Sequence, residues 1–256
     1  MREIIAKEFG DEDRNEVLNL YEKCKLAKEK DIPMFGNNFY PPNIWRWFEN
    51  TFNSSSFKVE SNGVFDDSER RMISFNNIYE TPFPMKLLKI KNTSKFNELT
   101  HKDFLGGILA VGIERNKIGD LLVKGDTCYV PVHEDIEGFL ISNIDKIGKT
   151  VCKVEVLEQC ESLPQFSFKE EVILVSSLRI DGIVSKLANV SRNKAQMMID
   201  QGKILIDYVK VRNKSYEVKE EERITIRGIG KFILGSIIGT SKSGRLKERI
   251  KKYTII

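Results

Sequence analysis

The 256-residue sequence predicts an α+β protein made of three consecutive parts. Three observations carry this prediction. The first part shows a helical repeat of apolar residues, the middle part alternates strand-like and helix-like segments, and the last part combines two short helices with strands and a surplus of basic residues. We expect an α-rich N-terminal segment at 1–80, a middle domain at 81–165 and a C-terminal domain at 172–256.

The N-terminal segment is expected to contain two helices. Residues 11–30 place apolar side chains at the spacing of one helix face. Residues 39–53 indicate a second helix, entered through two prolines that fit a first helical turn. Trp45 and Phe48 share one face of this helix, and we expect them to pack in a core. A role of that face in binding a partner protein is the alternative.

The middle part has the order β-α-β-β-α-β, which is typical of the ferredoxin-like split fold. RNA-recognition domains share this fold with many unrelated proteins. Its central strand offers only one aromatic residue, Tyr129, so base stacking is not assumed. Within the first helix, Thr100 and Asp103 are spaced as a capping box, which we prefer to an acid–base pair of His101 and Asp103. The expected elements are a strand at 86–92, a helix at 99–113, a hairpin at 120–132, a helix at 136–148 and a strand at 150–158.

The C-terminal part is expected to begin with a strand after a linker at 158–171. The other expected elements are helices at 178–190 and 191–202, strands at 203–207, 209–213 and 222–234, and a basic tail at 238–253.

The distribution of charge points to a polyanionic partner for the C-terminal part. Net charge is only +4, but residues 178–256 hold 18 Lys and Arg against 8 Asp and Glu, whereas residues 1–177 hold 23 against 29. A basic third on an acidic body indicates nucleic-acid binding. A solvated lysine-rich face is the alternative interpretation.

The sequence concentrates this charge at the start of a helix. Ser191 is a good N-cap, and Arg192 and Lys194 follow it in the first turn. The helix dipole disfavours cations there and favours anions. We therefore expect an RNA phosphate to bind at this position.

Cofactor, metal and membrane chemistry are not expected. The cysteines Cys24, Cys128, Cys152 and Cys160 and the two histidines lack metal-ligand spacing, so reduced structural thiols are predicted. No apolar run is long enough to cross a bilayer, and the charged N-terminus lacks an export signal, which favours the cytoplasm. We predict no catalytic residue.

Residues 178–235, with Arg-hydrophobic-Asp, Ser-Arg-x-x-Ala and Ile-x-x-Gly-x-Ile in order, resemble the S-four RNA-binding module of ribosomal proteins. One departure is Asp207-Tyr208, where the module usually has Asn-Gly; tyrosine disfavours a type I′ turn, so a longer turn or another type is expected. The resemblance implies an RNA-binding set of Arg179, Arg192, Lys194, Lys203, Lys210, Arg212, Arg227 and Lys231, with Lys242 and Arg245 of the tail as further candidates.

Residues 60–253 also resemble the YlmH family, most clearly in the segment LTHKDFLGGILAVGIERNKIGDLLV at 99–123. This resemblance implies a non-catalytic protein that binds rRNA of the large ribosomal subunit and peptidyl-tRNA and assists alanine tailing of stalled chains. A quality-control elongation factor or a division protein is a further possible partner. The alternatives are an RNA-binding adaptor in cell division and an rRNA-modifying enzyme, for which Asp181 is the nearest catalytic candidate; we expect Asp181 to pair with a nearby basic residue instead.

Overall fold

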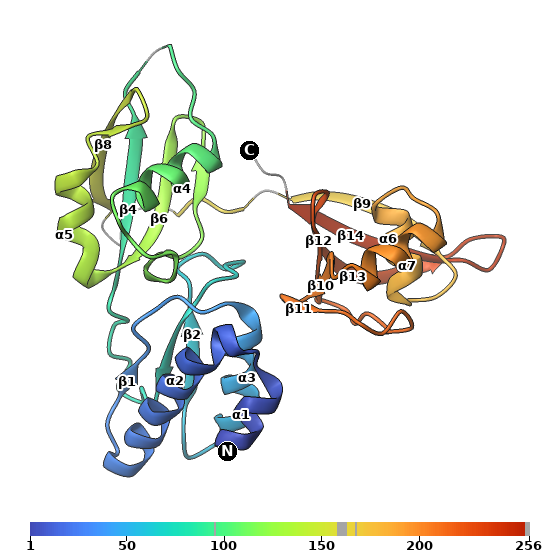
Figure 1. Cartoon of the computed structure of the whole chain (residues 1–256), viewed down its shortest axis with the longest axis horizontal. Helices are drawn as coiled ribbons and strands as arrows, with labels where there is room; N and C mark the ends of the chain where they lie inside the picture. The colour runs from blue at the N-terminus through green and yellow to red at the C-terminus, as the bar shows by residue number, and fades with distance from the viewer. Residues whose placement is uncertain (95, 158–162, 167, 254–256) are drawn as a thin grey trace. The chain divides into compact units, whose positions relative to one another are not determined.

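The computed structural model of the chain describes residues 1–94, 96–157, 163–166 and 168–253, and it divides into two compact units (Figure 1). The N-terminal unit comprises residues 1–165 and the C-terminal unit residues 166–255. The predicted division between 1–80 and 81–165 falls inside the N-terminal unit. The N-terminal unit contains two hydrophobic cores and the C-terminal unit one, and each unit is described by itself.

The first part of the N-terminal unit packs helices on a small antiparallel sheet of order β1-β3-β2. Its elements are α1 (Arg2–Glu8), α2 (Asp11–Lys30), β1 (Met34–Phe35), α3 (Pro42–Phe52), β2 (Val59–Asn62) and β3 (Met72–Phe75). Both predicted helices are confirmed. Trp45 and Phe48 of α3 are 6% and 0% exposed in the core of this part. The alternative that their face binds a partner is therefore wrong, because the protein itself covers it.

The second part of the unit confirms the predicted β-α-β-β-α-β order. Its elements are β4 (Met85–Asn92), α4 (His101–Ala110), a 3₁₀ turn η1 (Arg115–Lys117), β5 (Leu122–Lys124), β6 (Thr127–His133), α5 (Glu134–Asn143), β7 (Lys146–Ile147) and β8 (Thr150–Leu157). The antiparallel sheet has the order β5-β6-β4-β8-β7. Side chains of α4 and α5 pack with one face of this sheet in a single core. α4 and α5 leave the opposite face uncovered, where Lys91, Lys124 and Lys153 are exposed but Leu87, His133 and Leu157 are buried.

The second helix of this part is shorter than the sequence predicts. Residues 136–148 were expected to be helical, but α5 ends at Asn143, and Ile147 lies in β7. Gly148, expected at the helix end, has a φ of 59° in the turn between β7 and β8. Ile144 and Ile147 are buried in either arrangement, so their apolar spacing does not distinguish a helix from a short strand.

The predicted helix cap and hairpin turn of this part are confirmed. The Thr100 N–H donates to the Asp103 carboxylate at 2.8 Å, and the Asp103 N–H donates to the Thr100 hydroxyl at 3.4 Å. This capping box gives Asp103 a structural role in place of an acid–base one. Gly125 turns the hairpin between β5 and β6 with a φ of 60°.

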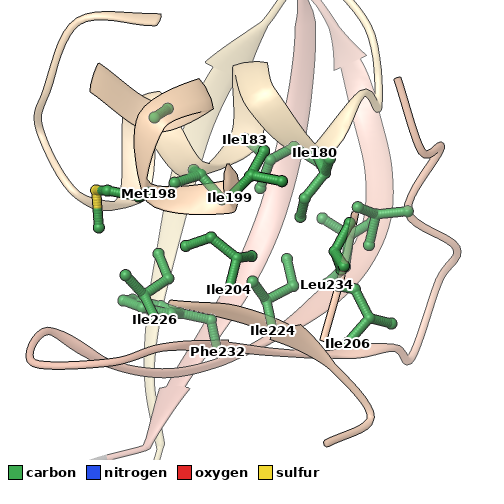
Figure 2. Close-up of a cluster of buried hydrophobic side chains, with 14 of the residues drawn as sticks. Ile180, Ile183, Met198, Ile199, Ile204, Ile206, Ile224, Ile226, Phe232 and Leu234 are labelled. Carbon is green, nitrogen blue, oxygen red and sulfur yellow. The ribbon is translucent and has the colours of Figure 1, made fainter. Parts of the chain in front are cut away.

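The C-terminal unit packs two helices against one six-stranded antiparallel sheet. Its elements are β9 (Phe168–Val175), α6 (Ile180–Leu187), α7 (Arg192–Asp200), β10 (Ile204–Ile206), β11 (Val209–Lys210), β12 (Arg223–Ile226), β13 (Gly230–Thr240) and β14 (Leu246–Tyr253). The strand order is β11-β10-β12-β13-β14-β9. Figure 2 shows Ile180, Ile183 and Ile199 of the helices facing isoleucines of the strands across the core.

Three expectations for this unit need correction. Residues 222–234 form two paired strands, β12 and β13, because residues 227–229 make a turn that reverses the chain. The basic tail at 238–253 lies in β13, a turn and β14, and β14 pairs with strands on both sides. β9 begins at Phe168, so part of the expected linker is strand. In a sequence, a β-strand with basic residues at alternate positions resembles a solvated tail, because its pairing with neighbouring strands is not visible.

The turn at Asp207-Tyr208 also differs from expectation. Ile206 pairs directly with Val209, and Asp207 and Tyr208 have φ angles of 44° and 72°. This is the two-residue loop with positive φ at both positions that tyrosine disfavours. Two contacts hold it: the Asp207 carboxylate accepts from the Arg223 N–H at 3.1 Å, and the Lys231 ammonium donates to the Tyr208 hydroxyl at 2.9 Å.

Cys24, Cys128 and Cys152 are buried free thiols, whereas Cys160 lies outside the described residues. Among the residues that the structure describes, no cluster of His, Cys, Asp and Glu could hold a metal ion. The described helices include none that is both long and apolar enough to cross a membrane.

Candidate RNA-binding surface

A buried carboxylate organises the start of the two helices in the C-terminal unit. Asp181, in the first turn of α6, has no exposed surface. Arg192 donates to it twice, from Nε and Nη2, at 3.0 Å each. Arg179 also donates twice, at 3.3 and 3.2 Å, and the Gln196 amide donates at 3.0 Å. Five hydrogen bonds thus converge on one carboxylate from α7 and from the residue before α6.

This arrangement keeps Asp181 ionised. Burial alone would raise its pKa, but the hydrogen bonds from Arg192, Arg179 and Gln196 outweigh burial and hold the pKa of Asp181 well below its usual range. The same contact raises the pKa of Arg192. The expected pairing of Asp181 with a nearby basic residue is confirmed. Its carboxylate accepts hydrogen bonds from both arginines and from Gln196.

The anion beside Arg192 is therefore supplied in part by the protein. The sequence suggested that an RNA phosphate explains the cations at the start of α7, but Asp181 already pairs with Arg192. Each guanidinium keeps an outer surface in solvent, since the Arg179 and Arg192 side chains are 36% and 50% exposed. A guanidinium held on one edge by a carboxylate presents its remaining N–H groups in a fixed direction. The pair is thus oriented before any ligand arrives.

Lys194 stands next to this pair without such a restraint. Ser191 caps α7 as predicted, since its hydroxyl accepts from the Lys194 N–H at 3.2 Å. The Lys194 ammonium is exposed and makes no ion pair with another described residue. It is the cation at this helix start that remains available to an external anion.

A second basic group lies at the other end of α7. The Arg227 N–H donates to the Lys203 carbonyl at 2.9 Å, which joins the turn after β12 to the loop after α7. Lys210 passes close to Gly202, where the φ is 65°. α7 has nine residues and is therefore about 13 Å long, which separates the two groups along one helix.

The remaining predicted residues are dispersed. Lys231 is held by Tyr208, with its ammonium 5.1 Å from the ring centre, and Arg212 is exposed in the loop after β11. Lys242 and Arg245 lie in the turn between β13 and β14. β13 has 11 residues and spans about 35 Å, so this turn is far from Lys231 at the start of the strand. The ten residues therefore do not form one surface.

The prediction missed Gln196 as a member of the surface. Gln196 lies four residues after Arg192 on α7, so both side chains reach the same side of the helix. That spacing was visible in the sequence. The partner that gives it meaning, Asp181, is on another helix, and no local pattern indicates that contact.

Comparisons with known proteins match two segments of the chain to different families. Residues 79–161 match the family described as a putative RNA-binding domain in YlmH, and residues 178–224 match the S4 domain. The ribosome-associated protein quality control protein P2 of Bacillus subtilis (strain 168) is 26% identical over 195 residues, which cover 74% of this chain and 76% of that protein.

A solved structure, the cell division protein ylmH from Streptococcus pneumoniae, is 22% identical and has a TM-score of 0.48, covering 59% of this chain and 93% of that chain. By the two family matches, the chain carries a domain of the kind described as a putative RNA-binding domain in YlmH, followed by an S4 domain.

Proposed function

We propose that this protein binds rRNA of the large ribosomal subunit through the start of α6 and α7 and acts in ribosome-associated quality control. The observation that carries the proposal is the pair of half-exposed arginines fixed by buried Asp181, with Lys194 beside them. Structured RNA is recognised largely by its shape and backbone, and oriented guanidinium groups bind phosphates at two points. The relative from Bacillus subtilis, named for ribosome-associated quality control, supports the biological setting.

Within that setting, the proposed ligands are the ribosomal subunit and a peptidyl-tRNA retained on it. Binding both would allow the protein to hold the stalled complex while a quality-control factor adds alanine to the chain. The action is then cytoplasmic, at the ribosome. The second basic group, at Lys203, Lys210 and Arg227, lies at the other end of α7 and would extend the contact to a second stretch of RNA backbone.

The proposed role is binding without catalysis. The nearest catalytic candidate, Asp181, accepts five hydrogen bonds and has no exposed surface. A carboxylate in this state cannot approach a nucleotide base. Both matched families are described by binding or domain names that specify no reaction.

The test is co-sedimentation of the full chain with purified large subunits in a sucrose gradient. The Lys194→Gln and Arg179→Gln variants should each release a large share of the protein, with affinity lowered about tenfold for a charge-assisted contact. Arg179→Gln and Arg192→Ala each also remove two hydrogen bonds from buried Asp181, so Lys194→Gln is the cleaner test.

The matched control is Lys219→Gln, which removes an exposed lysine from the loop before β12 in the same unit. This variant should sediment like the parent protein. Full retention of the Lys194 and Arg179 variants on the subunit would refute the proposed surface. Failure of the parent chain itself to sediment with subunits at low salt would refute the proposed function.

A further inference from the structure

The sheet of the YlmH-type domain has one face that α4 and α5 leave open. Side chains at alternate positions of β4, β6 and β8 belong to the core shared with these helices. The other positions face away from that core. On this helix-free face, the lysines are Lys89, Lys91, Lys124, Lys146 and Lys153.

Three of these lysines form a row across four strands. Lys124 pairs with Thr127, Thr127 pairs with Lys91, and Lys91 pairs with Lys153. Neighbouring strands are about 4.8 Å apart, so the row extends for about 14 Å. Lys91, Lys124 and Lys153 are all exposed.

Lys91 and Lys153 are directly opposite each other on adjacent strands, an arrangement that destabilises a sheet when the charges are alike. Only one carboxylate, Glu155, occupies the described strand positions of this face. Glu155 pairs with Lys153, and its pKa is lowered first by the Lys153 hydrogen bond and also by Lys89 and Lys91. One carboxylate does not balance five lysines, so the face keeps a clear surplus of positive charge.

Aromatic side chains accompany the row. Tyr129 is half-buried on β6 and is paired directly with Lys89 of β4. Phe96 is 95% exposed in the loop that leaves β4. That loop is tied to the end of the sheet at which the row lies, since the Thr93 N–H donates to the Val151 carbonyl at 3.1 Å. A second contact, from the Asn92 amide to the Asn97 carbonyl at 2.6 Å, comes from the helix-covered face of β4. A fully exposed phenylalanine packs on nothing in the described protein.

We infer that this helix-free face is a second RNA surface, which binds single-stranded RNA through phosphates on the lysine row and bases on Tyr129 of this face and on Phe96 beyond the end of the sheet. Charge complementarity selects a polyanion, and the aromatic side chains select one with flat bases. A lysine row binds phosphates as separate point charges, without reading sequence. The inference rests on the proposed RNA-binding function and adds a site, the residues that form it and the class of RNA.

The test measures binding of a fluorescein-labelled 12-nucleotide oligouridylate to the full chain by fluorescence anisotropy at several salt concentrations. The Lys91→Gln/Lys153→Gln variant should bind about tenfold more weakly. Its plot of log affinity against log salt should be shallower by about 1.4, since each single-strand phosphate contact contributes about 0.7. The matched control, Lys86→Gln/Lys102→Gln, removes the same charge from the helix-covered face of β4 and from α4, and it should bind like the parent.

Phe96→Ala tests the aromatic contribution without a risk to folding, because the side chain is 95% exposed. Loss of one stacked base should weaken binding roughly fivefold. A labelled 12-residue polyglutamate is the comparison ligand. Polyglutamate that binds as tightly as RNA, with both ligands indifferent to Phe96→Ala, would assign the face to an acidic protein and overturn the inference.

The proposed function and the proposed second RNA surface can be refuted independently. When Lys194→Gln is combined with Lys91→Gln/Lys153→Gln, the two losses of RNA-binding affinity should add, because the residues lie in different units and share no partner. If Lys91→Gln/Lys153→Gln binds oligouridylate like the parent while Lys194→Gln loses ribosome binding, the second surface is refuted and the proposed function stands. If neither variant changes any RNA binding, both are refuted.

Discussion

The two basic surfaces of this protein are organised in opposite ways. At the start of α6 and α7, a buried carboxylate fixes two arginines, so the negative charge of Asp181 helps to form a cationic surface. On the helix-free sheet face, lysines face one another across strands, and the carboxylate of Glu155 is an exposed neighbour that reduces the positive charge. The first surface depends on geometry and the second on the amount of charge.

This difference bears on how each surface discriminates among ligands. Oriented guanidinium groups lose little freedom on binding and accept only phosphates placed to match them. Mobile lysines accept many arrangements of phosphates, and their binding weakens steeply with salt. We expect the S4 domain to recognise a folded RNA structure and the sheet to hold an unpaired strand.

The Asp181→Asn variant best distinguishes binding by oriented arginines from binding by the amount of positive charge. This substitution makes the protein more positive, yet it should weaken large-subunit binding at least tenfold, because Arg179 and Arg192 lose their fixed directions. Loss of charge-assisted hydrogen bonds at a buried position should also lower the free energy of unfolding of the C-terminal unit by about 2–3 kcal/mol. Sedimentation and denaturant unfolding measure the two effects. Tighter subunit binding by this variant would show that charge alone governs the surface.

Exchanging arginine and lysine should affect the two surfaces differently. Arg192→Lys retains the charge but cannot reproduce the two-point contact with Asp181, so we expect a loss of about 1 kcal/mol in stability and a weaker subunit complex. Lys91→Arg should leave oligouridylate affinity unchanged within about twofold, because no fixed geometry is lost. Equal effects of the two substitutions would contradict the distinction.

Glu155→Gln is the counterpart of Asp181→Asn. Both substitutions remove one negative charge, but Glu155 is exposed and neutralises neighbouring lysines. Oligouridylate affinity should therefore rise, by roughly two- to fourfold at low salt, and the gain should disappear as salt screens the surface. Thermal unfolding should show an unchanged fold. A fall in affinity would mean that Glu155 positions Lys153 much as Asp181 positions Arg192.

A smaller contrast is expected in the response to acid. His133 caps α5, and its Nδ1 accepts from the Asp135 N–H at 3.2 Å. Burial lowers the pKa of His133, against the opposing effect of Asp135. The unfolded chain therefore takes up this proton near pH 6.5 and the folded chain only at lower pH, so the N-terminal unit should lose stability as pH falls below about 6.5. The low pKa of Asp181 predicts no comparable loss from that group in the C-terminal unit over the same range.

Tryptophan fluorescence during urea unfolding at pH 7 and pH 5 measures this effect, since Trp45 and Trp47 both lie in the N-terminal unit. The His133→Asn variant is the control, because asparagine caps a helix without titrating in this range. If the variant keeps the full pH dependence, another group is responsible.

The sequence anticipated the parts of the fold that depend on local periodicity. Both N-terminal helices, the β-α-β-β-α-β order and the Ser191 and Thr100 caps are present as predicted. The prediction was wrong where burial, or pairing between distant segments, determines the secondary structure. Ile147 satisfies a helical stripe but lies in β7. Residues 222–234 read as one strand because Gly228, which turns the chain with a φ of 83°, fits a bulge within a strand equally well.

The candidate sites show the same limit. Arg192 and Lys194 stood out as cations at a helix start, but their different roles depend on Asp181, which is distant in sequence. The lysine row was not anticipated at all. Lys89, Lys91 and Lys153 alternate visibly along their strands, but only the register between β4 and β8 shows that Lys91 and Lys153 are opposite each other. Register is a property of pairs of strands, and a single sequence does not display it.

The position of β14 sets the order in which the C-terminal unit can be assembled during synthesis. β9 is made first in this unit, yet its only neighbour among the described strands of the sheet is β14, which is made after every other strand. Until residues 246–253 have emerged, β9 has no partner and β13 keeps an unpaired edge. Such long-range pairing is slow and leaves a strand edge exposed to other chains. A nascent copy halted before Leu246 would therefore be a candidate for aggregation and for degradation.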